Sequence, residues 1–102
     1  MASRLSLSND LKNKVGLENR YFQPPESVKM HYPCAVYKRT RMSIQYANDQ
    51  VYRYKKAYEI EIIDPNPDSE FVDRMLLAFP YISYARHFVY DNLNHDVFIV
   101  YY

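Results

Sequence analysis

The sequence is poor in residues that several common catalytic and structural motifs require. It contains a single glycine, Gly16, a single cysteine, Cys34, and no tryptophan. P-loops and dinucleotide-binding loops need several glycines to bring backbone N–H groups against phosphates, so both motifs are excluded. One cysteine cannot form an intrachain disulfide, and its place in an apolar run predicts a small core residue.

Long apolar runs are missing as well. No run approaches the ~20 residues of a transmembrane helix, and residues 1–8 lack the apolar segment of a signal peptide. We therefore expect a soluble protein, made in a reducing compartment, with no membrane partner. The length of 102 residues predicts a single domain, residues 1–102.

Net charge is close to zero, but the charges are unevenly distributed. The chain has 13 basic and 12 acidic residues and a formal charge of +1. Residues 29–56 hold Lys29, Lys38, Arg39, Arg41, Arg53, Lys55 and Lys56 against Asp49, whereas residues 57–80 hold Glu59, Glu61, Asp64, Asp68, Glu70 and Asp73 against Arg74. Such blocks could pair head to tail between copies of the chain, although an ordinary solvated surface explains them too.

Tyrosine is the abundant residue, with 12 copies. Tyrosine is large, rigid and amphipathic, and it is enriched where a partner buries the surface. A β-rich domain that uses tyrosine at half-buried strand positions is the alternative. Both interpretations can hold together.

The chain is organised around residues 51–79. In residues 51–63, tyrosines and isoleucines alternate with charged residues, which predicts a strand with one apolar and one charged face. Residues 64–67 end this strand, and Asn66 as N-cap with Pro67 at the first helical position predicts a helix from there to Phe79. Its expected apolar stripe is Phe71, Val72, Met75, Leu76 and Phe79.

The remaining elements complete an αββαββ order. We expect a first helix over residues 6–16, capped by Ser6 or Ser8, with Leu7, Leu11 and Val15 inward and Gly16 at its end. A core over residues 32–102 adds strands at 32–38, 81–90 and 97–102, a loop of about ten residues before residue 51, and a turn at 91–95. The predicted class is α+β, with about four strands in a mixed or antiparallel sheet and two helices on one face.

Enzymatic and nucleic-acid functions have some support in the sequence. His87, Asp91, His95 and Asp96 are possible metal ligands, but they lack an established ligand spacing. Glu59 and Glu61 could be paired catalytic carboxylates, yet a solvated strand face explains them, and no serine-nucleophile elbow motif is present. The basic stretch of residues 38–56, interleaved with tyrosines, could bind nucleic acid. We expect no enzyme activity, catalytic residue, metal or cofactor.

With these residues laid out, the chain resembles the small neck proteins of tailed bacteriophages, of the tail-terminator or tail-completion family. The resemblance rests on five segments: PPESVKM at 24–30, YPCAVYK at 32–38, YAND at 46–49, YEIEIIDPNPDSE at 58–70 and DNLNHDVF at 91–98. It covers residues 24 to the end, and the first helix agrees only in kind.

The resemblance implies a structural virion protein, assembled in the host cytoplasm. It would form a ring, a hexamer, that caps the tail tube and joins the tail to the head connector. The implied partners are further copies of the chain, the tail tube protein, head–tail connector or adaptor proteins and, in a contractile tail, the sheath. A head-closure protein is the alternative station in the same neck. The candidate interface residues are Pro24, Pro25, Glu26, Arg39, Arg41, Tyr46, Asn48, Arg53, Lys55, Glu59, Glu61, Asp91, Asn92, Asn94 and His95.

Overall fold

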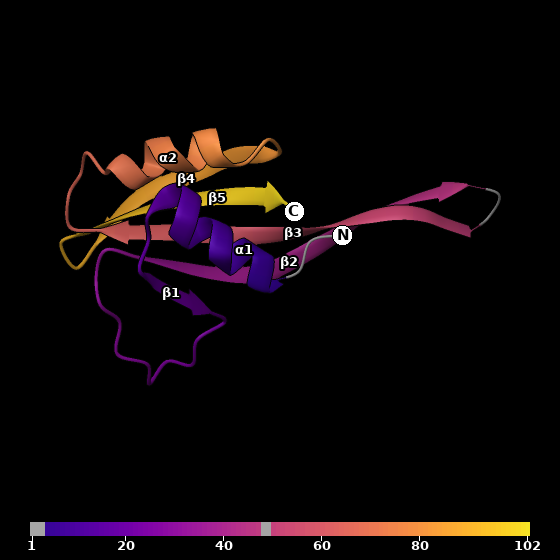
Figure 1. Ribbon diagram of the computed structural model, residues 1–102. Helices are drawn as coiled ribbons and strands as arrows, with labels where there is room; N and C mark the ends of the chain where they lie inside the picture. Colours follow the sequence, from indigo (N-terminus) through magenta and orange to yellow (C-terminus); the bar gives the residue numbers. More distant parts are fainter. Residues whose placement is uncertain (1–3, 48–49) are drawn as a thin grey trace.

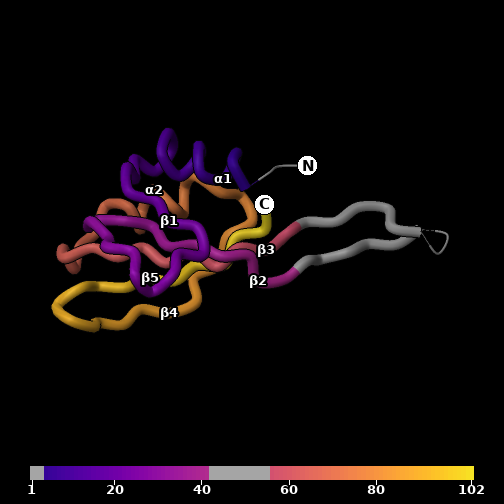
Figure 2. Tube along the Cα trace, turned by 90° about the horizontal axis from the view of Figure 1, so that it is seen from below, coloured from indigo at the N-terminus to yellow at the C-terminus, as the bar shows by residue number. Residues whose placement is uncertain are grey.

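Five strands form one open mixed sheet, and the helices pack against one of its faces (Figures 1 and 2). The computed structural model describes residues 4–47 and 50–102, with side chains described for residues 4–41 and 56–102. The elements are α1 (Arg4–Asp10), its π-helical continuation η1 (Leu11–Val15), β1 (Asn19–Phe22), β2 (Cys34–Ala47), β3 (Gln50–Asp64), α2 (Glu70–Ala78), β4 (Ile82–Tyr90) and β5 (Leu93–Tyr101). The predicted α+β class, with helices on one face, is confirmed.

The strand order across the sheet is β1-β2-β3-β5-β4. β1 pairs in parallel with β2, and every other neighbouring pair is antiparallel. The four predicted strands are present, and β1 is a fifth strand in a segment expected to be a connection. β5 lies between β3 and β4 as a central strand, which explains why its residues 97–101 are apolar on both faces.

The alternation predicted for the long central strand is confirmed where its side chains are described. Tyr58, Ile60 and Ile62 are buried beneath the helices, whereas Glu59 and Glu61 lie on the opposite face. Their partners in the core come from every layer: Leu7, Leu11, Val15, Leu17, Ala35, Tyr37, Met75, Phe79, Phe98 and Val100. One hydrophobic cluster therefore joins both helices to the sheet.

The N-terminal helix has the predicted apolar face but begins earlier than predicted. Leu7, Leu11 and Val15 are fully buried. Gly16 follows with a positive φ of 89°, and its N–H donates to the Lys12 carbonyl at 3.1 Å, which ends the helix as glycine commonly does. The predicted serine cap is wrong, because the helix is already formed at Arg4 and both candidate serines lie inside it.

The second helix begins three residues later than its sequence signals indicate. Ser69 occupies the N-cap position of α2, and Asn66 instead accepts a hydrogen bond from the Asp68 N–H at 3.0 Å. Asp64 makes the same kind of turn by accepting from the Asn66 N–H at 2.9 Å. Asparagine and aspartate side chains accept backbone hydrogen bonds both in turns and at helix N-caps. Asn66 in the sequence was therefore compatible with either, and the structure uses it in a turn.

The expected loop before the central strand is wrong. β2 continues to Ala47 and pairs with β3 in antiparallel register from Cys34↔Ile63 to Ala47↔Gln50. β3 pairs with β5 only from Ala57 onward, so the far part of the β2–β3 hairpin is paired with no other strand and projects from the domain (Figure 1). The turn predicted at Asn48 and Asp49 lies outside the described residues.

The register of β4 corrects a second expectation. Ile82 and Tyr84 lie on the helix face, but a bulge between Tyr84 and Arg86 moves Phe88 and Tyr90 to the other face. An extra residue in one strand shifts the side-chain alternation by one position. The even spacing of Ile82, Tyr84, Phe88 and Tyr90 in the sequence predicts one shared face, and the bulge instead divides them between two. The β4–β5 turn is Asp91 and Asn92, both with positive φ, as two-residue hairpin turns require.

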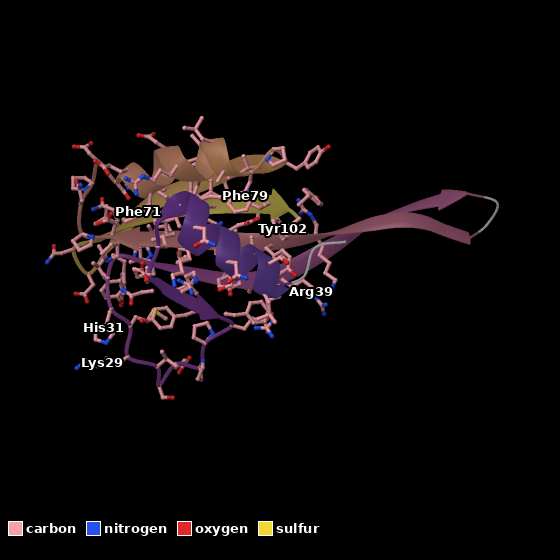
Figure 3. All side chains as sticks on the ribbon, viewed as in Figure 1. Lys29, His31, Arg39, Phe71, Phe79 and Tyr102 are labelled. Carbon is pink, nitrogen blue, oxygen red and sulfur yellow. The ribbon has the colours of Figure 1, made fainter. Side chains whose placement is uncertain are left out.

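The C-terminal strand is tied to the first helix by its last residue. The Tyr102 hydroxyl donates to an Asp10 carboxylate oxygen, and its ring meets that of Phe79 edge to face at 6.0 Å (Figure 3). The Tyr102 N–H donates to the Lys56 carbonyl at 2.9 Å. Burial and the neighbouring Asp10 carboxylate raise the pKa of Tyr102. Tyr102 thus links the base of the projecting hairpin to the end of α1.

Candidate functional site

The β4 edge, residues Ile82–Tyr90, is the most exposed apolar element of the described chain. β4 is the last strand of the sheet, and every residue after Ile82 in it is exposed. The large apolar side chains that it and its neighbours present are Tyr81, Tyr84, Phe88, Val89 and Tyr90, with Leu76 and Leu77 on α2. An exposed, apolar edge strand offers unpaired backbone groups to another chain, so it marks an interaction surface or an aggregation hazard.

Tyr84 anchors this edge to the interior. Its hydroxyl donates to the buried Asp96 carboxylate at 2.5 Å, and its ring packs edge to face on Phe98 at 5.1 Å. Partial burial, together with the hydrogen bond to Asp96 and its negative charge, raises the pKa of Tyr84 to about 12. The protonated phenol is therefore the form that stabilises the fold.

Tyr84→Phe should make the stability difference from wild type depend on pH in the alkaline range. A folded-state pKa raised from 10.0 to about 12 gives a contribution fully present below pH 10 and lost as pH rises toward 12. Urea denaturation should show wild type more stable than Tyr84→Phe up to about pH 9 and the difference shrinking above pH 10. A difference that stays constant to pH 12 would contradict the Tyr84–Asp96 contact. Tyr90→Phe, on the exposed end of the same strand, is the control.

The face of the sheet opposite the helices brings charged and ionisable side chains of neighbouring strands together. Lys38 Nζ lies 3.4 Å from Glu59 Oε2, and His95 Nδ1 lies 3.3 Å from Glu61 Oε1. His95 is buried and stacks on Phe88 with ring centroids 4.5 Å apart. These contacts place Glu59 and Glu61 in a charged sheet face, which gives both carboxylates a structural role.

The hypothetical metal cluster of the β4–β5 hairpin is not assembled. His87 pairs with Asp96 and His95 pairs with Phe88, so the two histidines are one register position apart and lie on opposite faces of the sheet. Among the residues the structure describes, no group of three histidine, cysteine or acidic side chains could hold a metal ion. Asp91 sits at the turn, where its positive φ serves the hairpin.

Cys34 is buried on the open face of the sheet, consistent with the predicted core role. Burial, and secondly the nearby Glu61 carboxylate, raises the pKa of the Cys34 thiol to about 12. Its thiolate fraction near neutral pH should be about a thousandfold below that of an ordinary cysteine, since each pKa unit is a factor of ten. We expect iodoacetamide to alkylate the folded protein at pH 8 much more slowly than the urea-unfolded protein. Equal rates would show that Cys34 is accessible.

A basic pocket, lined by Arg4, Phe22, Gln23, Arg39, Lys56 and Tyr58, lies where α1, β1 and the base of the hairpin meet; its volume is about 260 Å³. The Arg4 guanidinium stands 4.7 Å from the centroid of the Phe22 ring. Gln23 adopts a positive φ and accepts a hydrogen bond from the Arg39 N–H at 3.4 Å. The pocket therefore combines three cations with two aromatic walls.

An acidic pocket of the same volume, about 260 Å³, lies beside the start of α2 and is lined by Pro67, Asp68, Ser69, Val72, Asp73 and Asp96. Asp68 and Asp73 are exposed, whereas Asp96 is buried at its floor. Ser69 is more than nine-tenths buried, and its hydroxyl forms no hydrogen bond within the described residues. The pocket thus offers acceptor oxygens without a matching cation.

The structure separates the predicted interface residues into several places. Pro24, Pro25 and Glu26 lie in the loop after β1, and Arg39 and Arg41 lie at the hairpin base, where the Arg41 Nε donates to the Tyr101 hydroxyl at 2.8 Å. The exposed turn holds Asp91 and Asn92. Asn48, and the side chains of Tyr46, Arg53 and Lys55, lie outside the described part of the structure.

Asn94 and His95 were expected in the turn, but both belong to β5 and are buried. The Asn94 amide donates to the carbonyls of Asp64 and Pro65 at 3.3 and 3.2 Å. It therefore holds the segment that leads into α2. Of the turn residues predicted for the interface, Asp91 and Asn92 at the tip of the hairpin are the exposed pair.

Sequence reasoning missed the β4 edge, Arg4 of the basic pocket and Ser69 of the acidic pocket. The aromatic density of residues 81–90 could have indicated the edge, because tyrosine and phenylalanine concentrate at buried interfaces. Nothing in the sequence indicates that Arg4 approaches Phe22, since that contact depends on how α1 crosses the sheet.

Comparison with protein-family models and with curated proteins gives no match. Within the described residues, no helix is both long and apolar enough to cross a membrane.

Proposed function

We propose that the protein is a structural component of a tailed-phage neck, assembled as a closed ring that ends the tail tube and faces the head connector. The five sequence segments that resemble the tail-terminator family support this proposal. In this role the protein acts by shape. One face of the ring meets the last ring of the tube, and the other presents no surface on which another tube subunit can add.

The exposed β4 edge is the observation that carries the proposal. Tyr84, Val89 and Tyr90 are 47%, 61% and 73% exposed on a strand that no described segment covers. Soluble monomers commonly protect such an edge with charges, bulges, proline or a covering segment; among the described residues β4 has a bulge beside Arg86 but no proline and no strand along its outer side. A protein that works inside an assembly instead buries its aromatic edge against a neighbouring subunit.

Ring formation requires two different surfaces on each copy. Heterologous contacts produce a ring when the rotation between subunits closes, and the resemblance predicts six copies. The uneven distribution of charge along the chain fits this requirement, because unlike surfaces attract at every contact.

The test is to mix purified protein with isolated tail tubes that lack a terminator. Mass photometry should show a closed ring of defined mass, and negative-stain images should show that ring at tube ends. A chain that stays monomeric at micromolar concentration and never decorates tube ends would overturn the proposal. Tubes incubated with albumin are the control.

The second candidate function is that of a head-closure protein in the same neck. Gold labelling of the protein in intact virions separates the two, because a terminator lies against the tube and a closure protein lies against the portal. Label on the portal side would favour head closure.

A further inference from the structure

Within the described residues, the three cations of the basic pocket lack partners of opposite charge. Arg4, Arg39 and Lys56 face one hollow, and in the described part of the chain none of them forms an ion pair. Several other basic side chains are engaged: Lys38 with Glu59, Arg74 with Glu70 and Arg41 with Tyr101. Like charges held together repel one another, so an anionic partner would relieve this repulsion.

The acidic pocket has the complementary deficiency. Asp68 and Asp73 form no ion pair among the described residues, and the Ser69 hydroxyl that lines the pocket has no hydrogen-bond partner. A buried hydroxyl left unpaired costs free energy, so this pocket also has room for a donor from elsewhere. A guanidinium or an ammonium group supplies both the charge and the N–H donors.

The two pockets lie toward opposite edges of the sheet. The basic pocket draws Phe22 from β1 and Arg39 from β2, whereas the acidic pocket draws Asp96 from β5, next to the β4 edge. Figure 3 places Arg39 at the base of the hairpin, far from the start of α2 shown in Figure 1. One copy therefore cannot bring its own pockets together, but two copies side by side can.

We infer that the acidic pocket of one copy receives Arg39 and Lys56 of the next, so that the β4 side of each subunit abuts the β2 side of its neighbour. The occupant of each pocket is a second copy of this chain. The contact joins unlike surfaces, which is the kind that closes into a ring, and it brings the aromatic β4 edge toward the neighbour. In its ring geometry this inference rests on the proposed function.

The pocket chemistry favours a protein partner over nucleic acid. The two exposed carboxylates of the acidic pocket, Asp68 and Asp73, match in number the two cations that would enter it, Arg39 and Lys56. A nucleic-acid phosphate would satisfy the cations but leave Asp68, Asp73 and Ser69 without partners. Nucleic-acid binding is therefore treated as a competing outcome of the test.

The test uses two charge-reversal variants of the full chain. Arg39→Glu with Lys56→Glu makes the basic pocket acidic, and Asp68→Lys with Asp73→Lys makes the acidic pocket basic. Each variant alone then confronts like charges at every contact, so we expect self-association to weaken about a hundredfold or more. The far-ultraviolet circular dichroism and melting temperature of each monomer should stay near wild type, because Arg39, Asp68 and Asp73 are exposed.

Mixing the two variants is the decisive measurement. In an equimolar mixture, a native contact alternates with a reversed but complementary contact, so rings should form again with both chains in equal amounts by native mass spectrometry. One chain carrying all four substitutions should also assemble. Lys12→Glu with Lys29→Glu is the control, because both residues are exposed and lie outside both pockets, and Lys29 points away from the domain (Figure 3).

The outcomes separate this inference from the proposed function. If each charge-reversal variant alone still forms rings like those of wild type, the proposed contact is wrong, but the proposed ring is not. Loss of assembly in both variants without recovery in the mixture would overturn the contact too. So would a basic pocket that binds DNA instead, in which case Arg39→Glu with Lys56→Glu would abolish DNA binding at low salt and leave assembly as in wild type. Rings that form through this contact but never bind tube ends would instead refute the neck function.

Discussion

Ile60→Asp is expected to leave the chain unfolded at 25 °C. Ile60 is fully buried at the centre of the sheet, in the cluster that also contains Tyr37 and Phe98. Aspartate there loses the apolar contacts and places an unpaired carboxyl group in a dry interior, which costs several kcal/mol or more. Small domains are stable by only ~5–15 kcal/mol, so little or no stability should remain.

Circular dichroism and urea denaturation would measure this loss directly. Glu59→Gln, one residue away on the same strand, is the matched control. Glu59 lies on the open face and pairs with Lys38 at 3.4 Å, so its loss should cost less than about 1 kcal/mol. If Ile60→Asp folds with a cooperative transition near that of wild type, the buried face of β3 has been assigned wrongly.

Leu11→Ala should destabilise the domain by about 2–5 kcal/mol, since truncating a buried leucine removes apolar contacts and leaves a cavity. Leu11 is fully buried in the cluster that joins η1 to Met75 on α2 and to the sheet. The prediction tests whether the N-terminal helix is an integral layer of the fold or an appended segment. The free energy of unfolding from urea titration is the measurement.

Leu5→Ala on the same helix is the control for this effect. Leu5 is 64% exposed, and surface substitutions of this kind usually change stability by less than about 0.5 kcal/mol. Equal effects of Leu5→Ala and Leu11→Ala would mean that the helix does not present the face described here. A small effect of both would mean that the core folds without this helix.

Local sequence patterns predicted the helix and strand segments that have one buried face and one solvent-exposed face. The alternation of Tyr58, Ile60 and Ile62 with Glu59 and Glu61 is such a pattern, and so is the spacing of Leu7, Leu11 and Val15. Each reports burial on one side of a single element, which a sequence encodes directly through side-chain polarity.

Elements defined by a partner strand escaped this reasoning. β1 has four residues and exists because β2 accepts its parallel pairing, and the outer part of β2 exists because β3 pairs with it. The bulge near Arg86 moved Phe88 and Tyr90 to the other face without any glycine or proline to announce it. Backbone hydrogen bonds between distant segments leave little trace in residue type.

The candidate surfaces divide in the same way. Sequence reasoning proposed interface residues from turns and charges, and it named Arg39 at the hairpin base, but it also named Asn94 and His95, which are buried. The basic pocket combines residues from four elements, and the acidic pocket adds Asp96 of β5 to residues 67–73 at the start of α2. No spacing along the chain can show such a combination.

By itself, the sequence determined the class of the fold, the buried face of the central strand and of the first helix, and the separation of basic from acidic residues along the chain. Tertiary structure alone decided that Arg4, Arg39 and Lys56 surround one hollow, that Asp68, Asp73 and Asp96 surround another, and that β4 is left at an open edge. The physical reason is the distance along the chain over which each feature is set. Burial and charge belong to individual residues, whereas pockets and strand edges depend on long-range pairing between segments.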